Sequence, residues 1–271
     1  MKQSPCLCAR VWSSGPTVTS SLVSVRGTLL GLWTWFAFGA VSSVGYCACL
    51  LLFLLTAPFD PNRRVTGTAI RWVGIAMVKC VPAWRFEYLE PVPRTLPERC
   101  VCVSNHCSNL DPFLLSHLPW EMKYLAKDVL FKIPAVGWGI KIAGDIPLVR
   151  GSTRSIKQAM QKAGLYVRRG MPVCIFAEGT RSLSGELLPF KDGAFRLAID
   201  QQAHVLPIAV GGTVHALRKG DWRPGSAHGV ILVGQPISAE GLRASDLPEL
   251  KKRVWQAVFE LREDLKRRGL A

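Results

Sequence analysis

The chain has no charged residue and no histidine between Gly27 and Phe59. A helix needs roughly 20 apolar residues to cross a bilayer, so this uncharged run of 33 residues is long enough to anchor the protein in a membrane. A cleaved signal peptide needs an apolar core of only about 7 to 15 residues. The length of the run therefore favours a retained anchor over a cleaved leader.

The uncharged run also lacks a strongly apolar centre. Its middle, Gly39 to Gly45, consists mostly of small residues and separates two apolar pieces that are each too short to span a bilayer alone. The run therefore permits either one tilted transmembrane helix or a hairpin that enters one leaflet. Basic residues flank it on both sides: Lys2, Arg10 and Arg26 before it, and Arg63, Arg64 and Arg71 after it. Because positive charge marks the cytoplasmic side, we expect the hairpin, with the rest of the chain on the cytoplasmic side of the membrane.

Residues 66–84 carry apolar side chains at helical spacing, interrupted by Arg71 and Lys79. An amphipathic helix of this kind either lies at a membrane interface or packs on a domain. For the interfacial arrangement we expect both cationic side chains to reach lipid phosphates.

No pair among the nine cysteines has C-x-x-C spacing. Several lie in apolar sequence, as Cys100 and Cys102 do, where a free cysteine behaves as a small hydrophobic residue. We therefore predict reduced thiols and no metal site.

Acidic residues are scarce, with 19 Asp and Glu against 34 Lys and Arg and a formal net charge of +15. This excess indicates an anionic partner: nucleic acid, a phosphate-bearing substrate or an acidic membrane face. The basic C-terminal helix carries no recognisable nucleic-acid motif, so we predict no nucleic-acid partner.

The sequence has no internal repeat, and its periodicity divides it into three parts. We expect a poorly ordered tail at 1–26, a helical membrane-anchoring segment at 27–84 and an α/β domain at 85–271. Within the domain, short apolar runs alternate with helical patterns, of which the longest lie at 152–169 and 246–268. Strands are predicted at 100–104, 122–126, 145–149, 172–177, 205–210 and 229–233. This alternation predicts a mixed, largely parallel sheet flanked by helices.

The loop after the strand at 100–104 contains a histidine and an aspartate five positions apart, His106 and Asp111. Ligands of such sheets bind beyond the carboxyl ends of the strands. Asp111 precedes Pro112, which suits the first position of a helix, so we expect Asp111 to be the helix N-cap. If the turn folds back, the carboxylate holds one imidazole nitrogen and leaves the other free as a base. The alternative is a surface histidine beside an aspartate that only caps a helix.

The strand at 172–177 ends in Glu178-Gly179-Thr180-Arg181. Glycine gives access to the backbone, and arginine offers a planar fork for phosphate or carboxylate. This combination suits an anionic headgroup. The alternative is a plain turn with an exposed arginine and no binding role.

Four sequence blocks in this order resemble those of the glycerolipid acyltransferase family, and most those of its lysophosphatidate acyltransferases. The blocks are NHCSNLD, GDIPLVR, FAEGTRS and LPIAV, and the resemblance covers about residues 65–235. It implies that His106 is the general base and that Asp111 orients it. It also implies that the glycerol phosphate is bound by Lys127, Arg150, Glu178, Gly179, Thr180 and Arg181.

The activity implied by this resemblance is transfer of an acyl chain from an acyl thioester to the free hydroxyl of lysophosphatidate, which forms phosphatidate at a membrane. The donor is acyl-CoA or acyl carrier protein, no cofactor or metal is needed, and the partners are the lipid bilayer and the lysophospholipid. Two alternatives stay open: another lysolipid as the acceptor, or hydrolysis of a lipid ester or thioester by the same base. A nucleophilic Cys107 is not expected, because neighbouring side chains on an extended chain point apart.

Overall fold

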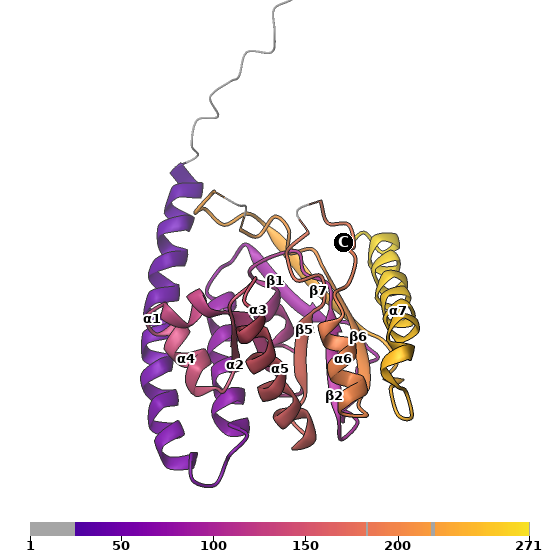
Figure 1. The fold of residues 1–271 in the computed structure, drawn as a ribbon. Coiled ribbons are helices and arrows are strands. Elements are labelled where there is room, and N and C mark those ends of the chain that lie inside the picture. Colours follow the sequence, from indigo (N-terminus) through magenta and orange to yellow (C-terminus); the bar gives the residue numbers. More distant parts are fainter. Residues whose placement is uncertain (1–24, 183, 218–219, 271) are drawn as a thin grey trace, which may run out of the picture.

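The computed structural model describes residues 25–182, 184–217 and 220–270. An eight-stranded sheet lies between helices, and the first two helices stand side by side at one edge of the molecule (Figure 1). This arrangement confirms the predicted fold class. The predicted tail, residues 1–26, lies outside the described residues except for its last two, and the division of the chain at residue 84 stays a prediction.

The sheet is mixed, with the order β1-β7-β6-β2-β5-β3-β4 and with β8 paired to β6. Strand β6 runs antiparallel to β7 and β8, and all other pairs are parallel. The strands are β1 Trp84–Tyr88, β2 Cys100–Ser104, β3 Lys123–Lys127, β4 Ile146–Leu148, β5 Val173–Phe176, β6 His204–Gly211, β7 Ala227–Val233 and β8 Ile237–Ser238. Six of them lie within two residues of the predicted positions, whereas β1 and β8 were not predicted.

The helices that cover the sheet are α3 Asp111–Leu115, α5 Thr153–Arg168, α6 Gly193–Asp200 and α7 Leu247–Arg267, whereas α4 Val136–Ile142 packs on the first two helices of the chain. Two 3₁₀ turns, Asp128–Lys132 and Ala244–Asp246, join them to the strands. Helix α5 begins after the cap Ser152, whose hydroxyl accepts the N–H of Ser155, and it is followed by Gly170 at φ +68°. Both ends match the predicted helix, because a polar cap and a left-handed glycine terminate helices.

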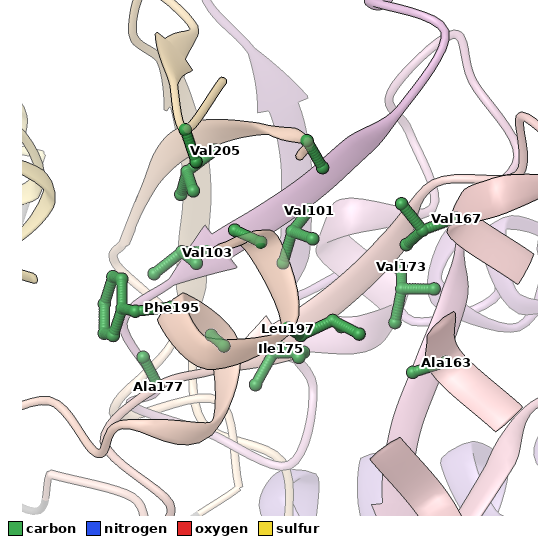
Figure 2. Packing of buried hydrophobic residues seen from close by; sticks show 14 of the residues in the cluster. Val101, Val103, Ala163, Val167, Val173, Ile175, Ala177, Phe195, Leu197 and Val205 are labelled. Carbon is green, nitrogen blue, oxygen red and sulfur yellow. The ribbon is translucent and has the colours of Figure 1, made fainter. Parts of the chain in front are cut away.

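The central strand β2 is buried on both faces, which explains its alternating cysteines and valines. Val101 and Val103 pack against residues of α5 and α6, including Ala163 and Phe195 (Figure 2). Cys100 and Cys102 point to the opposite face, where α3 covers the sheet. The cysteines within the described residues are free thiols, as predicted.

Helices α1 Val25–Thr56 and α2 Arg64–Lys79 pack against each other. The predicted hairpin within the uncharged run is wrong, because α1 continues without a break through Gly39 to Gly45. A side chain at Gly45 would collide with Val73 of α2, since its Cβ would lie 2.6 Å from the methyl carbons. Gly45 therefore allows close packing of two helices, and the small residues do not interrupt the first one.

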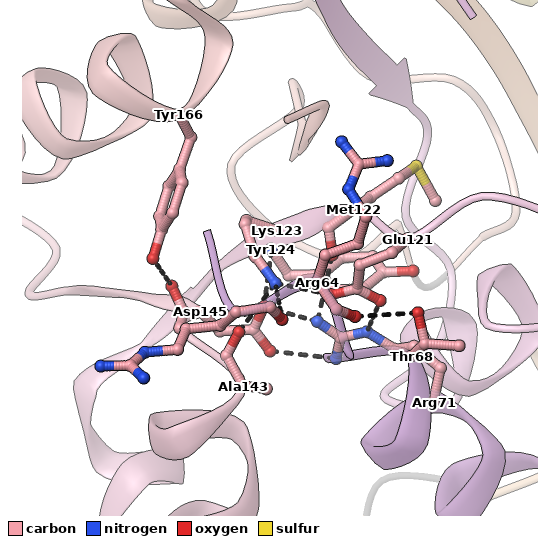
Figure 3. A network of polar contacts seen from close by, with 12 residues as sticks. Arg64, Thr68, Arg71, Glu121, Met122, Lys123, Tyr124, Ala143, Asp145 and Tyr166 are labelled. Atoms are coloured by element: carbon pink, nitrogen blue, oxygen red, sulfur yellow. Dashed lines mark hydrogen bonds and ion pairs between the residues drawn. The ribbon is translucent and has the colours of Figure 1, made fainter. Parts of the chain in front are cut away.

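Arg71 of α2 is buried, which corrects the expectation that it reaches lipid phosphates. Its guanidinium donates to both carboxylate oxygens of Asp145, at 3.0 and 2.6 Å, and lies 3.4 Å from Glu121 (Figure 3). Lys123 Nζ donates to Glu121 across 2.8 Å. This charged cluster joins α2 to β3 and to the start of β4, whereas the second cation, Lys79, is exposed.

Candidate active site

The predicted site residues follow strands that run in the same direction. Strands β2, β5, β3 and β4 are successive parallel neighbours. His106 lies two residues beyond β2, Glu178 two residues beyond β5, and Arg150 two residues beyond β4, while Lys127 is the last residue of β3. Because the carboxyl ends of parallel strands share one edge of the sheet, these residues lie along that edge, with neighbouring strands about 5 Å apart.

His106 and Asp111 are in direct contact. The imidazole Nδ1 lies 2.7 Å from Asp111 Oδ2. The aspartate side chain is fully buried, and 13% of the histidine side chain is exposed. The imidazole also stacks on Phe176, with ring centroids 4.1 Å apart. Nδ1 is therefore occupied, and Nε2 is the nitrogen that can accept a proton.

Asp111 is the first residue of α3, and Leu110 is the N-cap, so the predicted capping role is wrong. The carboxylate points back into the preceding turn. Its Oδ2 accepts the backbone N–H groups of Cys107 and Ser108 at 2.7 and 2.8 Å. Three donors on one oxygen hold the carboxylate in place beside the imidazole, because hydrogen bonds to an ionised group are strong.

Glu178 joins the two loops of the site. Its Oε1 accepts the backbone N–H of His106 across 3.0 Å, and the N–H of Ser182 donates to the carbonyl of His106 across 2.8 Å. Burial raises the pKa of the Glu178 carboxyl to about 7, and the backbone N–H of His106 opposes this rise. The backbone of the general-base loop is therefore fastened to the loop after β5.

Three predicted cationic residues are available for an anion. Arg181 is half-buried, and Lys127 and Arg150 are exposed. Within the described part of the chain none of the three forms an ion pair or a side-chain hydrogen bond. Thr180 is exposed, and Gly179 has φ +68°, which favours glycine. Over the residues that the structure describes, no hydrogen bond or ion pair joins the side chains of these residues to His106, so their predicted contact with substrate stays a prediction.

Cys107 is unsuited to act as a nucleophile, although it is adjacent to the histidine. Burial raises the pKa of its thiol to about 12, and the Asp111 carboxylate adds to this rise. The thiolate is the reactive form, so the thiol stays unreactive near neutral pH. Among the described residues there is also no cluster of three His, Cys, Asp or Glu side chains that could hold a metal ion.

Two further residues hold the site: Thr213, which was not predicted, and Asn105, which was expected to shape the turn. The Thr213 hydroxyl donates to Asp111 Oδ1 across 2.6 Å. The Asn105 side chain exchanges two hydrogen bonds with the backbone of Val210, at 2.8 and 3.0 Å. Strand β6 is parallel to β2, so Thr213, two residues beyond β6, lies at the same edge as the other site residues. His106 was located from its place just beyond the carboxyl end of a strand, and the same criterion applied to β6 would have pointed to Thr213.

Comparisons with known proteins agree with this geometry. The model of the Acyltransferase family matches residues 84–211. The 1-acyl-sn-glycerol-3-phosphate acyltransferase beta of Homo sapiens is 30% identical over 258 residues, which cover 94% of this chain and 89% of that protein. A chloroplastic 1-acyl-sn-glycerol-3-phosphate acyltransferase of Brassica napus is 38% identical over 184 residues, which cover 65% of this chain. The matched part spans only 52% of the length of the Brassica protein.

A solved structure is also similar to this chain. The crystal structure of PlsC, the 1-acyl-sn-glycerophosphate (LPA) acyltransferase from Thermotoga maritima, superposes with a TM-score of 0.75 and 25% sequence identity. The superposition covers 89% of this chain and 97% of the Thermotoga chain. Together with the sequence matches, it confirms the resemblance inferred from the four blocks: the chain belongs to the family of 1-acyl-sn-glycerol-3-phosphate acyltransferases.

Proposed function

We propose that this protein transfers an acyl chain from an acyl thioester to the free hydroxyl of lysophosphatidate, which forms phosphatidate. The observation that carries the proposal is the contact of 2.7 Å between His106 Nδ1 and a buried Asp111 carboxylate. The names of the relatives supply the substrate class. The donor is acyl-CoA or acyl carrier protein, and no cofactor takes part.

The proton movements follow from this contact. His106 Nε2 removes the proton of the acceptor hydroxyl while its oxygen attacks the thioester carbonyl carbon. The negative charge of Asp111 stabilises the imidazolium that forms. When the tetrahedral intermediate collapses, the C–S bond breaks and the imidazolium protonates the leaving thiolate. The histidine returns to its starting state, and no acyl group is attached to the enzyme.

The unpaired cations along the carboxyl edge of the sheet are assigned to the phosphate. Arg181 offers a planar fork that suits a phosphate monoester. Lys127 is the last residue of β3 and Arg150 follows β4, and these are the two strands farther along the same edge. With Gly179, Thr180 and Arg181 they form the proposed glycerol-phosphate site, and Glu178 contributes by joining the loop after β5 to the His106 loop.

Helix α1 supports membrane association. It is long and apolar enough to span a bilayer, and only 11% of its most apolar stretch is buried. A core helix of a soluble protein would be mostly buried. Large apolar side chains that α1 exposes include Leu29, Leu32, Trp33, Phe36, Val44, Leu51, Leu54 and Leu55. We place the catalytic domain on the cytoplasmic side, because basic residues flank the helix at both ends.

Labelling of single cysteines in sealed vesicles tests this orientation. The probes are Ser13→Cys in the N-terminal tail and an exposed position of the catalytic domain, each in a background without native thiols. If both probes react only from the cytoplasmic side, α1 and α2 enter one leaflet. If Ser13→Cys reacts only from the opposite side, α1 crosses the membrane.

Product analysis tests the activity itself. The purified full chain is incubated with acyl-CoA or acyl carrier protein and, separately, lysophosphatidate, lysophosphatidylethanolamine, a lyso-aminolipid or no acceptor. We expect phosphatidate as the main product. A preference for another lysolipid would identify that lysolipid as the acceptor in place of lysophosphatidate. Release of free fatty acid at the same rate without any acceptor would show that the protein is a hydrolase.

A further inference from the structure

A groove with a volume of about 570 Å³ lies where α1, the start of α2 and α4 meet. Aromatic and aliphatic side chains form most of its wall, and two cations complete it. Its lining residues are Tyr46, Phe53, Arg63, Trp138, Lys141 and Ile142. The groove therefore combines an apolar wall with local positive charge.

The two cations lack anionic partners. Neither Arg63 nor Lys141 forms an ion pair with any residue that the structure describes. The Arg63 guanidinium lies 4.3 Å from the centre of the Phe53 ring, and its Nη1 is buried without a hydrogen-bond partner. The carboxylate of nearby Asp60 accepts the N–H of Val65 across 2.7 Å. Because a buried donor without an acceptor is costly, the geometry favours an anion beside Arg63.

This groove is separate from the proposed acyl-transfer site. Arg64, the residue after Arg63, donates from Nη2 to the carbonyl of Gly170 across 3.0 Å. Gly170 precedes β5, whereas Glu178 and the general-base loop lie beyond the carboxyl end of that strand. The groove therefore lies toward the amino-terminal edge of the parallel strands, away from His106.

One side of the groove is formed by the apolar helix α1, which contributes Tyr46 and Phe53. The Tyr46 ring lies 5.6 Å from the ring of Trp138, which is 47% exposed. Tyrosine and tryptophan are enriched where the headgroup layer meets the hydrocarbon. A ligand that fits carries both a phosphate for the cations and an acyl chain for the apolar wall.

We propose that the groove binds an anionic phospholipid of the surrounding bilayer, with its phosphate between Arg63 and Lys141 and an acyl chain against Phe53 and Ile142. A zwitterionic lipid fits less well, because its ammonium or choline group would bring a third positive charge to two unpaired cations. Binding at this site does not depend on acyl transfer.

The test measures contact between lipid and Trp138 in the full-length protein. The protein is reconstituted in phosphatidylcholine vesicles, and increasing fractions of phosphatidylglycerol with brominated chains are added, with brominated phosphatidylcholine as the parallel series. Bromine quenches tryptophan fluorescence at short range. The part of the quenching that Trp138→Phe removes reports occupancy of the groove. No thioester is added, so acyl transfer does not take place during the measurement.

The double variant Arg63→Gln/Lys141→Gln is compared with the control Lys252→Gln/Arg253→Gln, which removes the same charge. The control residues are exposed on α7, on the side of the molecule opposite α1 (Figure 1). Each pair is prepared with and without Trp138→Phe. The single variant Lys141→Gln is added because Lys141 is exposed and its loss leaves folding intact.

We expect Trp138-dependent quenching by brominated phosphatidylglycerol in the wild type and the control. In the double variant the lipid fraction for half-maximal quenching should rise about tenfold or more, as loss of a charged hydrogen bond predicts, and in Lys141→Gln it should rise by a smaller factor. An equal loss in the control, equal quenching by brominated phosphatidylcholine, or an unchanged Lys141→Gln would overturn the proposal. Phosphatidate formation is assayed separately, so failure of one proposal leaves the other standing.

Discussion

The hydroxyl of Thr213 donates a hydrogen bond of 2.6 Å to Oδ1 of Asp111, the carboxylate whose other oxygen contacts His106. Both oxygens of the aspartate are therefore engaged, one by the imidazole and its loop and one by the loop after β6. Thr213 does not touch the reacting atoms, so we regard it as a positioning residue.

Replacing Thr213 by valine removes this hydrogen bond and leaves Asp111 Oδ1 buried without a donor. A lost hydrogen bond to a charged group costs about 1.5 to 3 kcal/mol. We expect kcat to fall by about tenfold or more, with KM for lysophosphatidate nearly unchanged. Thr213→Ser keeps the hydroxyl and should restore most of the rate. Equal activity of the valine and serine variants would show that the contact has no part in positioning Asp111.

Replacing His106 by alanine removes the proposed general base. Asp111→Asn removes the negative charge that stabilises the His106 imidazolium. General-base catalysis contributes about 10² to 10⁴-fold. We expect kcat of both variants to fall within this range while the thermal unfolding curve shows a folded protein. Turnover of purified His106→Ala near the wild-type rate would rule out the mechanism.

Replacing Arg181 by glutamine tests its role in phosphate binding. A charged hydrogen bond is worth about 1.5 to 3 kcal/mol, so KM for lysophosphatidate should rise roughly tenfold or more. With monoacylglycerol, a neutral acceptor, the change should be smaller. A loss of the same size for both acceptors would indicate that Arg181 only supports the loop.

Glu178 should make the stability of the protein depend on pH. Burial raises its pKa from the ordinary 4.5 to about 7 in the folded state. Between these values the unfolded chain releases the proton while the folded protein keeps it, so stability falls as the pH rises through this window and then levels off. Glu178→Gln keeps an oxygen that can accept the His106 N–H and removes the titration. We expect Tm of the wild type to fall more than Tm of the variant between pH 5 and pH 8; parallel curves would contradict the raised pKa.

Arg71 should matter for stability, because its loss leaves the buried Asp145 carboxylate without its ion-pair partner and leaves Glu121 with Lys123 alone. Removing one partner of a buried ion pair costs about 3 to 5 kcal/mol. We expect Arg71→Met to lower the free energy of unfolding by this amount in urea titrations in detergent. Arg85→Met is the control, since Arg85 pairs with Glu87 at the surface with 72% of its side chain exposed, and surface pairs contribute about 0 to 1 kcal/mol. Equal effects of the two substitutions would show that the cluster does not stabilise the fold.

The strands that the sequence predicts well are those with continuous apolar character. Strand β2 was predicted at its observed bounds, because both of its faces are buried and its pattern is uniform. Strand β1, WRFEY, mixes charged and aromatic residues and is only partly buried, and β8 has two residues. Neither has a local pattern that separates it from a loop, so both depend on the strands beside them.

The anchor shows where local composition misleads. The small residues from Gly39 to Gly45 look like a break in an apolar run, but the helix continues through them, and Gly45 permits close contact between α1 and α2 at Val73. Arg71 likewise looks like a surface cation of an amphipathic helix until Asp145 and Glu121 are placed beside it. In both cases the deciding neighbour lies on a different element of the chain.

The sequence by itself determined the elements that are local: six of the eight strands, the glycine-ended helix, and a histidine close enough to an aspartate for one turn to join them. Only the tertiary structure decided which distant residues complete the site. Thr213 reaches Asp111 over 102 positions, Glu178 reaches His106 over 72, and Arg71 reaches Asp145 over 74. The physical reason is that such contacts depend on the order and direction of the strands. Periodicity shows that a segment is a strand, but not which strand lies beside it.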